Sequence, residues 1–287
     1  MKAIYKRELK SYFNSMIGYA VIGFFLLVLG FYFWGFNLSG QSPAIGKTLS
    51  GISLVYTIIL PILTMRLLAE EQRQKTDQLL FSSPVSIGDV VLGKFFAVVT
   101  IFSLPMLVIC SMPLVLSQFG HVAFLKSYSA IFAFWMLGCV MIALGILVSS
   151  FTDNQIVAAV ISFAVNILIF LMQSVAGIVP EAAIASLIGF TVVALLVALF
   201  LFIFSHNIIV SGGLFAVVEI AMVVVYFVKG ELFESAFSTA LSSISFYARF
   251  GDFVNGTFNL GSIVYYISFI GLFLYLTIQS VQKRRWS

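Results

Sequence analysis

The sequence predicts an all-α membrane protein that crosses a lipid bilayer many times. Of the 287 residues, 61% are apolar and 9% are charged, whereas soluble domains carry about 25% charged residues. Whole stretches contain no Asp, Glu, Lys or Arg, among them residues 11–46, 154–180 and 182–218. A helical crossing needs about 20 apolar residues. Spanning strands would be about 10 residues long with alternating polarity, and that pattern is not found here.

Eight hydrophobic segments account for most of the chain, and each is predicted to be a helix because lipid offers no water to the backbone. They are residues 16–36, 49–68, 90–117, 128–150, 156–179, 182–204, 208–228 and 260–281.

Lys and Arg predict the orientation. If the N-terminus is cytoplasmic, 11 of the 15 basic residues fall on the cytoplasmic side and 4 on the outside. The positive-inside rule therefore predicts that both termini are cytoplasmic. An even number of crossings agrees with this orientation.

Three further stretches are too polar to be simple crossings. Residues 1–15 alternate basic and apolar side chains, which predicts an amphipathic helix in the membrane interface or, alternatively, a basic tail that sets topology. Residues 230–259 are aromatic and semi-polar, and we expect amphipathic helices at the outer interface. Residues 66–94 form the longest predicted cytoplasmic loop.

That loop is distinctive because charges of both signs precede an apolar patch. It is either a docking helix for a soluble partner or an ordinary solvated helix. Its candidate contact residues, polar first and then apolar, are Glu70, Glu71, Arg73, Lys75, Asp77, Leu79, Leu80 and Phe81.

Signatures of catalysis and cofactor binding are largely missing. Gly46-Lys47-Thr48 ends like a P-loop, but Gln41 stands where the pattern requires glycine. Cys110 and Cys139 lie in apolar segments without metal-ligand spacing. We therefore expect no catalytic, cofactor or metal site on this chain. The basic residues form no stripe on a soluble domain, so no nucleic-acid partner is expected.

Glu219 is the ionisable residue deepest in a hydrophobic segment. Such a carboxyl group usually faces a protein interior or a wet cavity, because its exposure to lipid is costly. It either contacts a substrate or proton in a translocation path or is a neutral, structural hydrogen-bonding group, or else its segment does not span the membrane. Asn166 and Gln173 are its candidate partners, with interhelical hydrogen bonding as the structural alternative.

Four stretches resemble the membrane subunits of ABC type-2 transporters, specifically the gliding-motility-type permeases. They are MKAIYKRELKSYFNSMIGY, MRLLAEEQRQKTDQLLFSSPVSIGDVVLGKF, LVSSFTDNQIVAA and the closing NGTFNLGSIVYYISFIGLFLYLTIQSVQKRRW. In that family they correspond to an interfacial helix, a coupling helix that touches the ATPase, a turn between the fourth and fifth crossings, and the last crossing.

The resemblance implies a single permease domain over residues 1–287 that exports a substrate across the cell membrane of a bacterium. Its partners would be a separate ATPase that carries ATP and Mg, a second permease copy or paralogue, and membrane lipid. Close relatives usually have six crossings, so residues 182–228 look like an inserted pair. The rival functions are an ATP-independent, ion-coupled carrier, a membrane-embedded enzyme, and a scaffold that recruits an ATPase without transport.

Overall fold

The computed structural model describes residues 1–76, 86–180, 182–205, 208–228 and 230–286. In these residues every regular element is a helix and no strand occurs, which confirms the all-α prediction. The elements are α1 (Lys2–Asn14), α2 (Met16–Phe33), a π-helix η1 (Trp34–Ser39), α3 (Ile45–Thr64), α4 (Arg66–Arg73), α6 (Ile87–Leu116), α7 (Phe124–Ser149), α8 (Gln155–Ile178), α9 (Ala183–Ser205), α10 (Ile208–Val228), a 3₁₀-helix η2 (Gly230–Phe233), α11 (Ala236–Ile244), α12 (Phe246–Asn255) and α13 (Leu260–Trp286).

Six helical spans in the described residues are long and apolar enough to cross a membrane, which confirms a polytopic bundle. They are Met16–Ser39, Ile45–Arg73, Ile87–Leu116, Phe124–Ser149, Gln155–Ile178 and Leu260–Arg284. The predicted extra pair forms α9 and α10, whose fully described apolar parts, Ala183–Ala198 and Phe215–Val228, are shorter.

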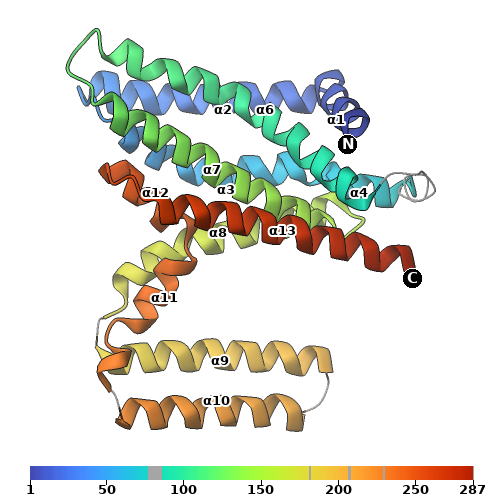
Figure 1. Ribbon diagram of the computed structural model, residues 1–287, viewed down its shortest axis with the longest axis vertical. Helices are drawn as coiled ribbons and strands as arrows, with labels where there is room; N and C mark the ends of the chain where they lie inside the picture. Colours follow the sequence, from blue (N-terminus) through green and yellow to red (C-terminus); the bar gives the residue numbers. More distant parts are fainter. Residues whose placement is uncertain (77–85, 181, 206–207, 229, 287) are drawn as a thin grey trace. The chain divides into compact units, whose positions relative to one another are not determined.

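The described chain divides into two compact units, residues 1–168 with 249–287 and residues 169–248. In the first unit α7 is the central helix, and it packs against α3, α6 and α13. It is also among the most buried of the spans, with 83% of its most apolar window inside the protein, compared with 17% for α2. Figure 1 shows α2, α3, α6, α7 and α13 running beside one another, with both termini and α4 at the same end.

An aromatic cluster around Tyr56 of α3 holds the first unit together. The Tyr56 ring is fully buried and stacks on Phe134 of α7 with 4.3 Å between ring centroids. Phe102 of α6 meets it edge-on at 5.5 Å, and Phe25 of α2 stacks at 6.0 Å. Such ring pairs add to the effect of area burial, so four helices are joined through one side chain.

Two glycines let α7 approach its neighbours closely. A Cβ at Gly138 would collide with the Phe102 ring of α6, and a Cβ at Gly145 would collide with Thr64 of α3. Small residues at membrane helix interfaces permit such close packing. The core of the first unit therefore depends on the absence of a side chain at these positions.

The second unit is built on the α9–α10 hairpin. Phe190 of α9 meets Phe237 of α11 edge-on at 5.1 Å and Phe233 of η2 at 6.3 Å. The backbone N–H of Phe237 donates to Ser186 of α9 at 3.3 Å. Residues 230–259 thus form three short helices, η2, α11 and α12.

Candidate coupling site

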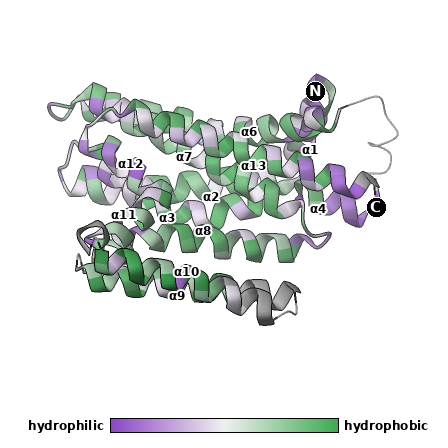
Figure 2. Ribbon diagram, turned by 60° about the horizontal axis from the view of Figure 1, so that its bottom comes forward, coloured by the Kyte–Doolittle hydropathy of each residue, from purple (hydrophilic) through white to green (hydrophobic). Residues whose placement is uncertain are grey.

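Strongly hydrophilic residues of the first unit gather around α1 and α4, as Figure 2 shows. Two breaks in the helices shape the end that contains both termini. Ser15 is extended, with φ −100° and ψ 148°, and separates α1 from α2. Pro61 lies in the last turn of α3, and α4 begins directly after Met65. These breaks bring α1 and α4 together beside the start of α6.

A buried ammonium group joins these three helices. Lys94 of α6 is 1% exposed, and its Nζ lies 3.1 Å from Glu8 Oε1 on α1 and 2.9 Å from Glu71 Oε1 on α4. It also donates to the carbonyl of Leu67 at 2.7 Å. Arg7 completes the network, with its Nη2 2.7 Å from Glu8 and 2.6 Å from Glu71. Two cations thus share two carboxylates, and each buried charge is paired.

The charges in this network shift the pKa values of its members. Burial alone would raise the pKa of Glu8, but the charges of Lys94 and Arg7 and their hydrogen bonds outweigh it and lower that pKa. Burial alone would lower the pKa of Arg7, but Glu8 and Glu71 outweigh it and raise that pKa. Both residues therefore keep their charge at neutral pH.

The Ser149 hydroxyl at the end of α7 fixes the start of α4. Its Oγ accepts from the backbone N–H groups of Leu68 at 3.2 Å and Ala69 at 3.1 Å. It donates to the carbonyl of Met65 at 3.0 Å. The first N–H groups of a helix have no partner within the helix. Ser149 supplies one from another helix, as an N-cap would, and thereby fixes α4 to α7.

Tyr12 connects α1 to the end of α3 through a side-chain hydrogen bond. It is 1% exposed, and its hydroxyl donates to the carbonyl of Leu63 at 2.6 Å. The Arg66 guanidinium lies over its ring at 4.1 Å, a cation–π contact. Burial raises the pKa of Tyr12, so the phenol keeps the proton that it donates.

A cavity of about 310 Å³ opens beside this network. Its lining comes from α1, α4, the residues just after α4, and Lys94 of α6. The lining residues are Arg7, Glu8, Ser11, Arg66, Leu67, Glu70, Glu71, Gln74, Thr76 and Lys94. Charges of both signs surround it, so its lining suits a polar group.

The predicted contact residues differ in their exposure and in their hydrogen-bond and ion-pair partners. Glu71 is engaged inside the chain by Arg7 and Lys94. Glu70 accepts from Gln74 at 3.2 Å, and Arg73 and Lys75 are exposed. The remaining four, Asp77, Leu79, Leu80 and Phe81, lie outside the described residues. Their contact with a partner stays a prediction.

The predicted translocation-path residues have different environments. Thr191 of α9 donates to Glu219 Oε1 at 3.0 Å, while Glu219 Oε2 is buried and has no hydrogen-bond partner among the described residues. Asn166 is fully buried, and neither atom of its amide is hydrogen-bonded within that part of the chain. Gln173 is exposed. Asn166 belongs to the first unit and the other two to the second.

The sequence did not identify Lys94, Glu8 or Ser149 as site residues. Lys94 stands at the start of an apolar segment, where it looks like one more basic residue at a membrane boundary. The signal that could have found it is a lone lysine with Val90, Val91, Phe95 and Val98 around it, since a lysine on an apolar helix needs a buried partner. The described residues contain no cluster of His, Cys, Asp or Glu that could hold a metal ion.

The site is a set of helices joined by buried charges at one end of a membrane bundle. No curated protein matches the sequence. The sequence model of the family described as ABC-2 family transporter protein matches residues 36–186, just over half of the 287 residues. The matched region runs from η1 to the start of α9 and includes α4 and Lys94. The chain therefore belongs to the ABC-2 transporter family and is a membrane-spanning permease subunit of an ABC transporter.

Proposed function

We propose that this permease couples ATP hydrolysis on a separate ATPase chain to export of a substrate across a bacterial cell membrane. It works with a second permease, identical or paralogous, and ATP and Mg bind to the ATPase. Within its family it is of the gliding-motility type. The single observation that carries the proposal is the double attachment of α4, through Glu71 to Lys94 and through Ser149 to α7.

The attachments of α4 allow a movement of the ATPase to reach the membrane helices. An ATPase that closes on ATP displaces the segment that follows α4. If α4 hung on a flexible loop, that loop would absorb the movement. Because α4 is bonded to α1, α6 and α7, the displacement reaches three helices together. A packed helix bundle does not deform continuously, so such a displacement shifts it from one discrete packing arrangement to another.

The outward residues of α4 and the turn after it offer the contact surface. Arg73 and Lys75 are exposed, and we propose that they meet carboxylates of the ATPase. Glu70 adds an acceptor beside the 310 Å³ cavity. Asp77, Leu79, Leu80 and Phe81 follow these residues in the sequence, and we propose that they also contact the ATPase. Glu71 acts from inside, because its carboxylate is already shared by two cations.

The test is affinity purification from native membranes, followed by an ATPase assay. Arg73→Glu with Lys75→Glu should reduce recovery of the ATPase and the hydrolysis that it shows. The matched control is Lys47→Glu with Lys126→Glu, which makes the same change of charge. These lysines lie near the starts of α3 and α7, far from α4, so recovery of the ATPase should be normal. Undiminished recovery and hydrolysis with the first pair would overturn the proposed contact.

Glu219 supports an additional proposal, that α9 and α10 line part of the substrate path. The supporting observation is its second carboxyl oxygen, which is buried without a partner among the described residues. A substrate or proton would complete its bonding. Glu219→Gln keeps the shape and should reduce substrate transport, because it removes the ionisable group. Undiminished transport would assign Glu219 a structural role.

A further inference from the structure

A second charged cavity lies at the end of the first unit opposite to α4. It encloses about 430 Å³ between the start of α3, the start of α7 and the end of α12. Its lining residues are Pro43, Ala44, Ile45, Gly46, Lys47, His121, Ala123, Lys126, Ser127, Ala130, Val254 and Asn255. The predicted orientation places it on the outside of the membrane.

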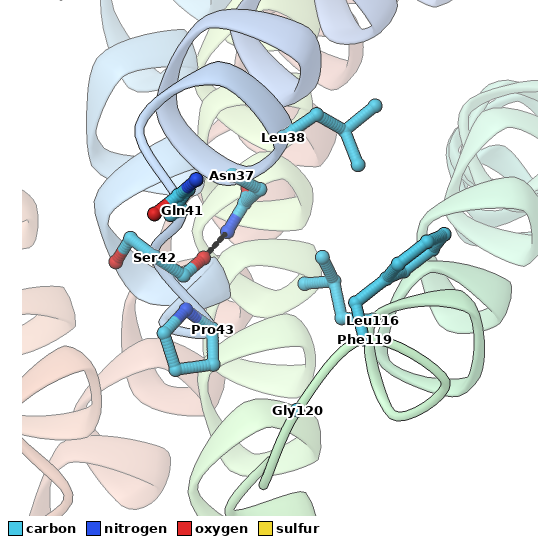
Figure 3. A pocket seen from close by; sticks show the side chains of 8 residues that line it. All are labelled: Asn37, Leu38, Gln41, Ser42, Pro43, Leu116, Phe119 and Gly120. Atoms are coloured by element: carbon cyan, nitrogen blue, oxygen red, sulfur yellow. Dashed lines mark hydrogen bonds between the residues drawn. The ribbon is translucent and has the colours of Figure 1, made fainter.

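The wall next to Pro43 is held by internal hydrogen bonds. Pro43 also lines an adjoining pocket of about 600 Å³, which Figure 3 shows from close by. There the side-chain amide of Asn37 donates to the carbonyl of Ser42 at 2.7 Å, and its oxygen accepts from Thr48 of α3. Asn37 is 3% exposed. The loop that leads into α3 is therefore fixed before any ligand binds.

The charged groups of the cavity all have one sign. Lys47 and Lys126 contribute ammonium groups, and His121 adds an imidazole. No lining residue is acidic. The carboxylate of Asp252, on the helix that contributes Val254 and Asn255, instead accepts a hydrogen bond from Ser262 at 3.5 Å. Neither lysine has a carboxylate partner among the described residues.

Neutral donors converge on the same space. The N-caps of α3 and α7 are Ala44 and Ala123, and neither provides a side-chain hydrogen bond. The first residues of both helices line the cavity, so the positive end of each helix dipole borders it. Ser127 is 5% exposed, and its hydroxyl has no hydrogen-bond partner in the part of the chain that the structure describes. Because Ser127 lines the cavity, its hydroxyl can donate to a ligand bound there.

We propose that this cavity binds a phosphate group, and that the phosphate belongs to the headgroup of an acidic phospholipid. Lys47, Lys126 and the Ser127 hydroxyl would hold its oxygens. The surroundings favour a lipid as its source, because exposed apolar side chains flank the cavity. Phe119 is 76% exposed and Leu125 is 88% exposed, and both lie within a few residues of the lining. Acyl chains can lie against these groups while the headgroup enters the cavity.

Native mass spectrometry of the full-length protein tests the proposal. Detergent micelles are doped with equal amounts of phosphatidylglycerol and phosphatidylcholine. The wild type should retain the anionic lipid in preference, and Lys47→Gln with Lys126→Gln should lower that preference by roughly fivefold or more. The matched control, Lys6→Gln with Lys10→Gln on α1, removes the same charge elsewhere and should keep it. Ser127→Ala should cause a smaller loss.

The outcomes distinguish specific lipid binding in the cavity from attraction of anionic lipid by the net positive charge of the protein. If the control variant loses as much preference for phosphatidylglycerol as the cavity variant, the preference comes from net charge and the site is overturned. An unchanged ratio of the two lipids in the cavity variant would also overturn it. Thermal unfolding with millimolar inorganic phosphate distinguishes the two sources of the anion. Stabilisation of the wild type but not of the cavity variant would show that free phosphate is sufficient. Stabilisation by phosphatidylglycerol alone would show that the acyl chains are required. ATPase recovery is a separate readout, so failure here leaves the coupling proposal standing.

Discussion

At the scale of single residues, a buried ammonium group such as Lys94 is stable only while its anionic partners surround it. Removal of one member of a buried ion pair leaves an uncompensated charge, which costs about 3–5 kcal/mol. The network contains two cations and two carboxylates. Loss of either buried partner therefore disturbs α1, α4 and α6 together.

Lys94→Met should strongly destabilise the protein, because Glu8 and Glu71 would then face each other with Arg7 as their one remaining cation. We expect a loss of about 3 kcal/mol. The measurement is the thermal unfolding midpoint in detergent. Lys10→Met is the control, since Lys10 is exposed on α1 and should shift stability by less than about 0.5 kcal/mol. Similar midpoints for the two variants would refute the role of Lys94.

The lowered pKa of Glu8 predicts how stability depends on pH. A carboxyl group whose folded-state pKa lies below its ordinary value of 4.5 stabilises the fold fully above that value. The contribution is lost as the pH falls below 4.5 through the lowered pKa. Unfolding midpoints of the wild type and Glu8→Gln should therefore differ at neutral pH and converge in acid. A constant gap down to pH 3 would contradict this assignment.

The ion pairs that join different helices in this network could not be read from the sequence. Glu8 and Lys94 are 86 positions apart in the hydrogen bond that joins them. Composition and periodicity describe neighbours along one helix and do not report which helices meet. Glu71 was predicted as part of the coupling segment, but its internal partners depend on the tertiary arrangement of α1 and α6.

At the scale of elements, the contact between α3 and α7 depends on Gly145. Gly145→Ala should destabilise the protein by about 1–3 kcal/mol, because its Cβ would collide with Thr64. The matched control is Gly23→Ala on α2, where nothing lies within 4 Å of the added Cβ. That change should be neutral or slightly stabilising, since alanine favours helix. Thermal unfolding compares the two, and an equal response would argue against a close α3–α7 contact.

Helix existence was predictable, whereas helix junctions were not. The segment expected over residues 49–68 is instead α3, which ends at Thr64, followed by α4 from Arg66. Hydropathy continues smoothly through that junction, because Leu67 and Leu68 are apolar. Similarly, the first segment ends in a π-helix, Trp34–Ser39, and no hydropathy pattern marks it. At Met65 the junction depends on a tertiary contact, because the carbonyl of this residue accepts a hydrogen bond from Ser149 of α7.

At the scale of the whole molecule, α3 and α7 each have one end at the coupling site and the other at the 430 Å³ cavity. Helices of 20 and 26 residues extend about 30–39 Å at 1.5 Å per residue, comparable to a hydrocarbon core of about 30 Å. We therefore expect the two sites to lie on opposite sides of a bilayer.

Single cysteines can test this placement in a background where Cys110 and Cys139 are replaced. In intact cells, a membrane-impermeant maleimide should label Lys126→Cys at once. It should label Gln74→Cys only after the cells are opened, because the positive-inside rule places α4 in the cytoplasm. Labelling of Gln74→Cys in intact cells would reverse the predicted orientation. Labelling of both positions from one side would contradict a spanning bundle.

The ion network around Lys94 also bears on how the chain enters the membrane during synthesis. Glu8 emerges from the ribosome long before Lys94 does, so its carboxylate remains hydrated until α6 is inserted. The bond then closes only if α6 enters with Lys94 on the side that already holds Glu8 and Glu71. Insertion of α6 in the opposite orientation would place Lys94 away from Glu8 and Glu71, so that their ion pairs could not form. The buried ion network is therefore a contact that only the completed arrangement of α1, α4 and α6 contains.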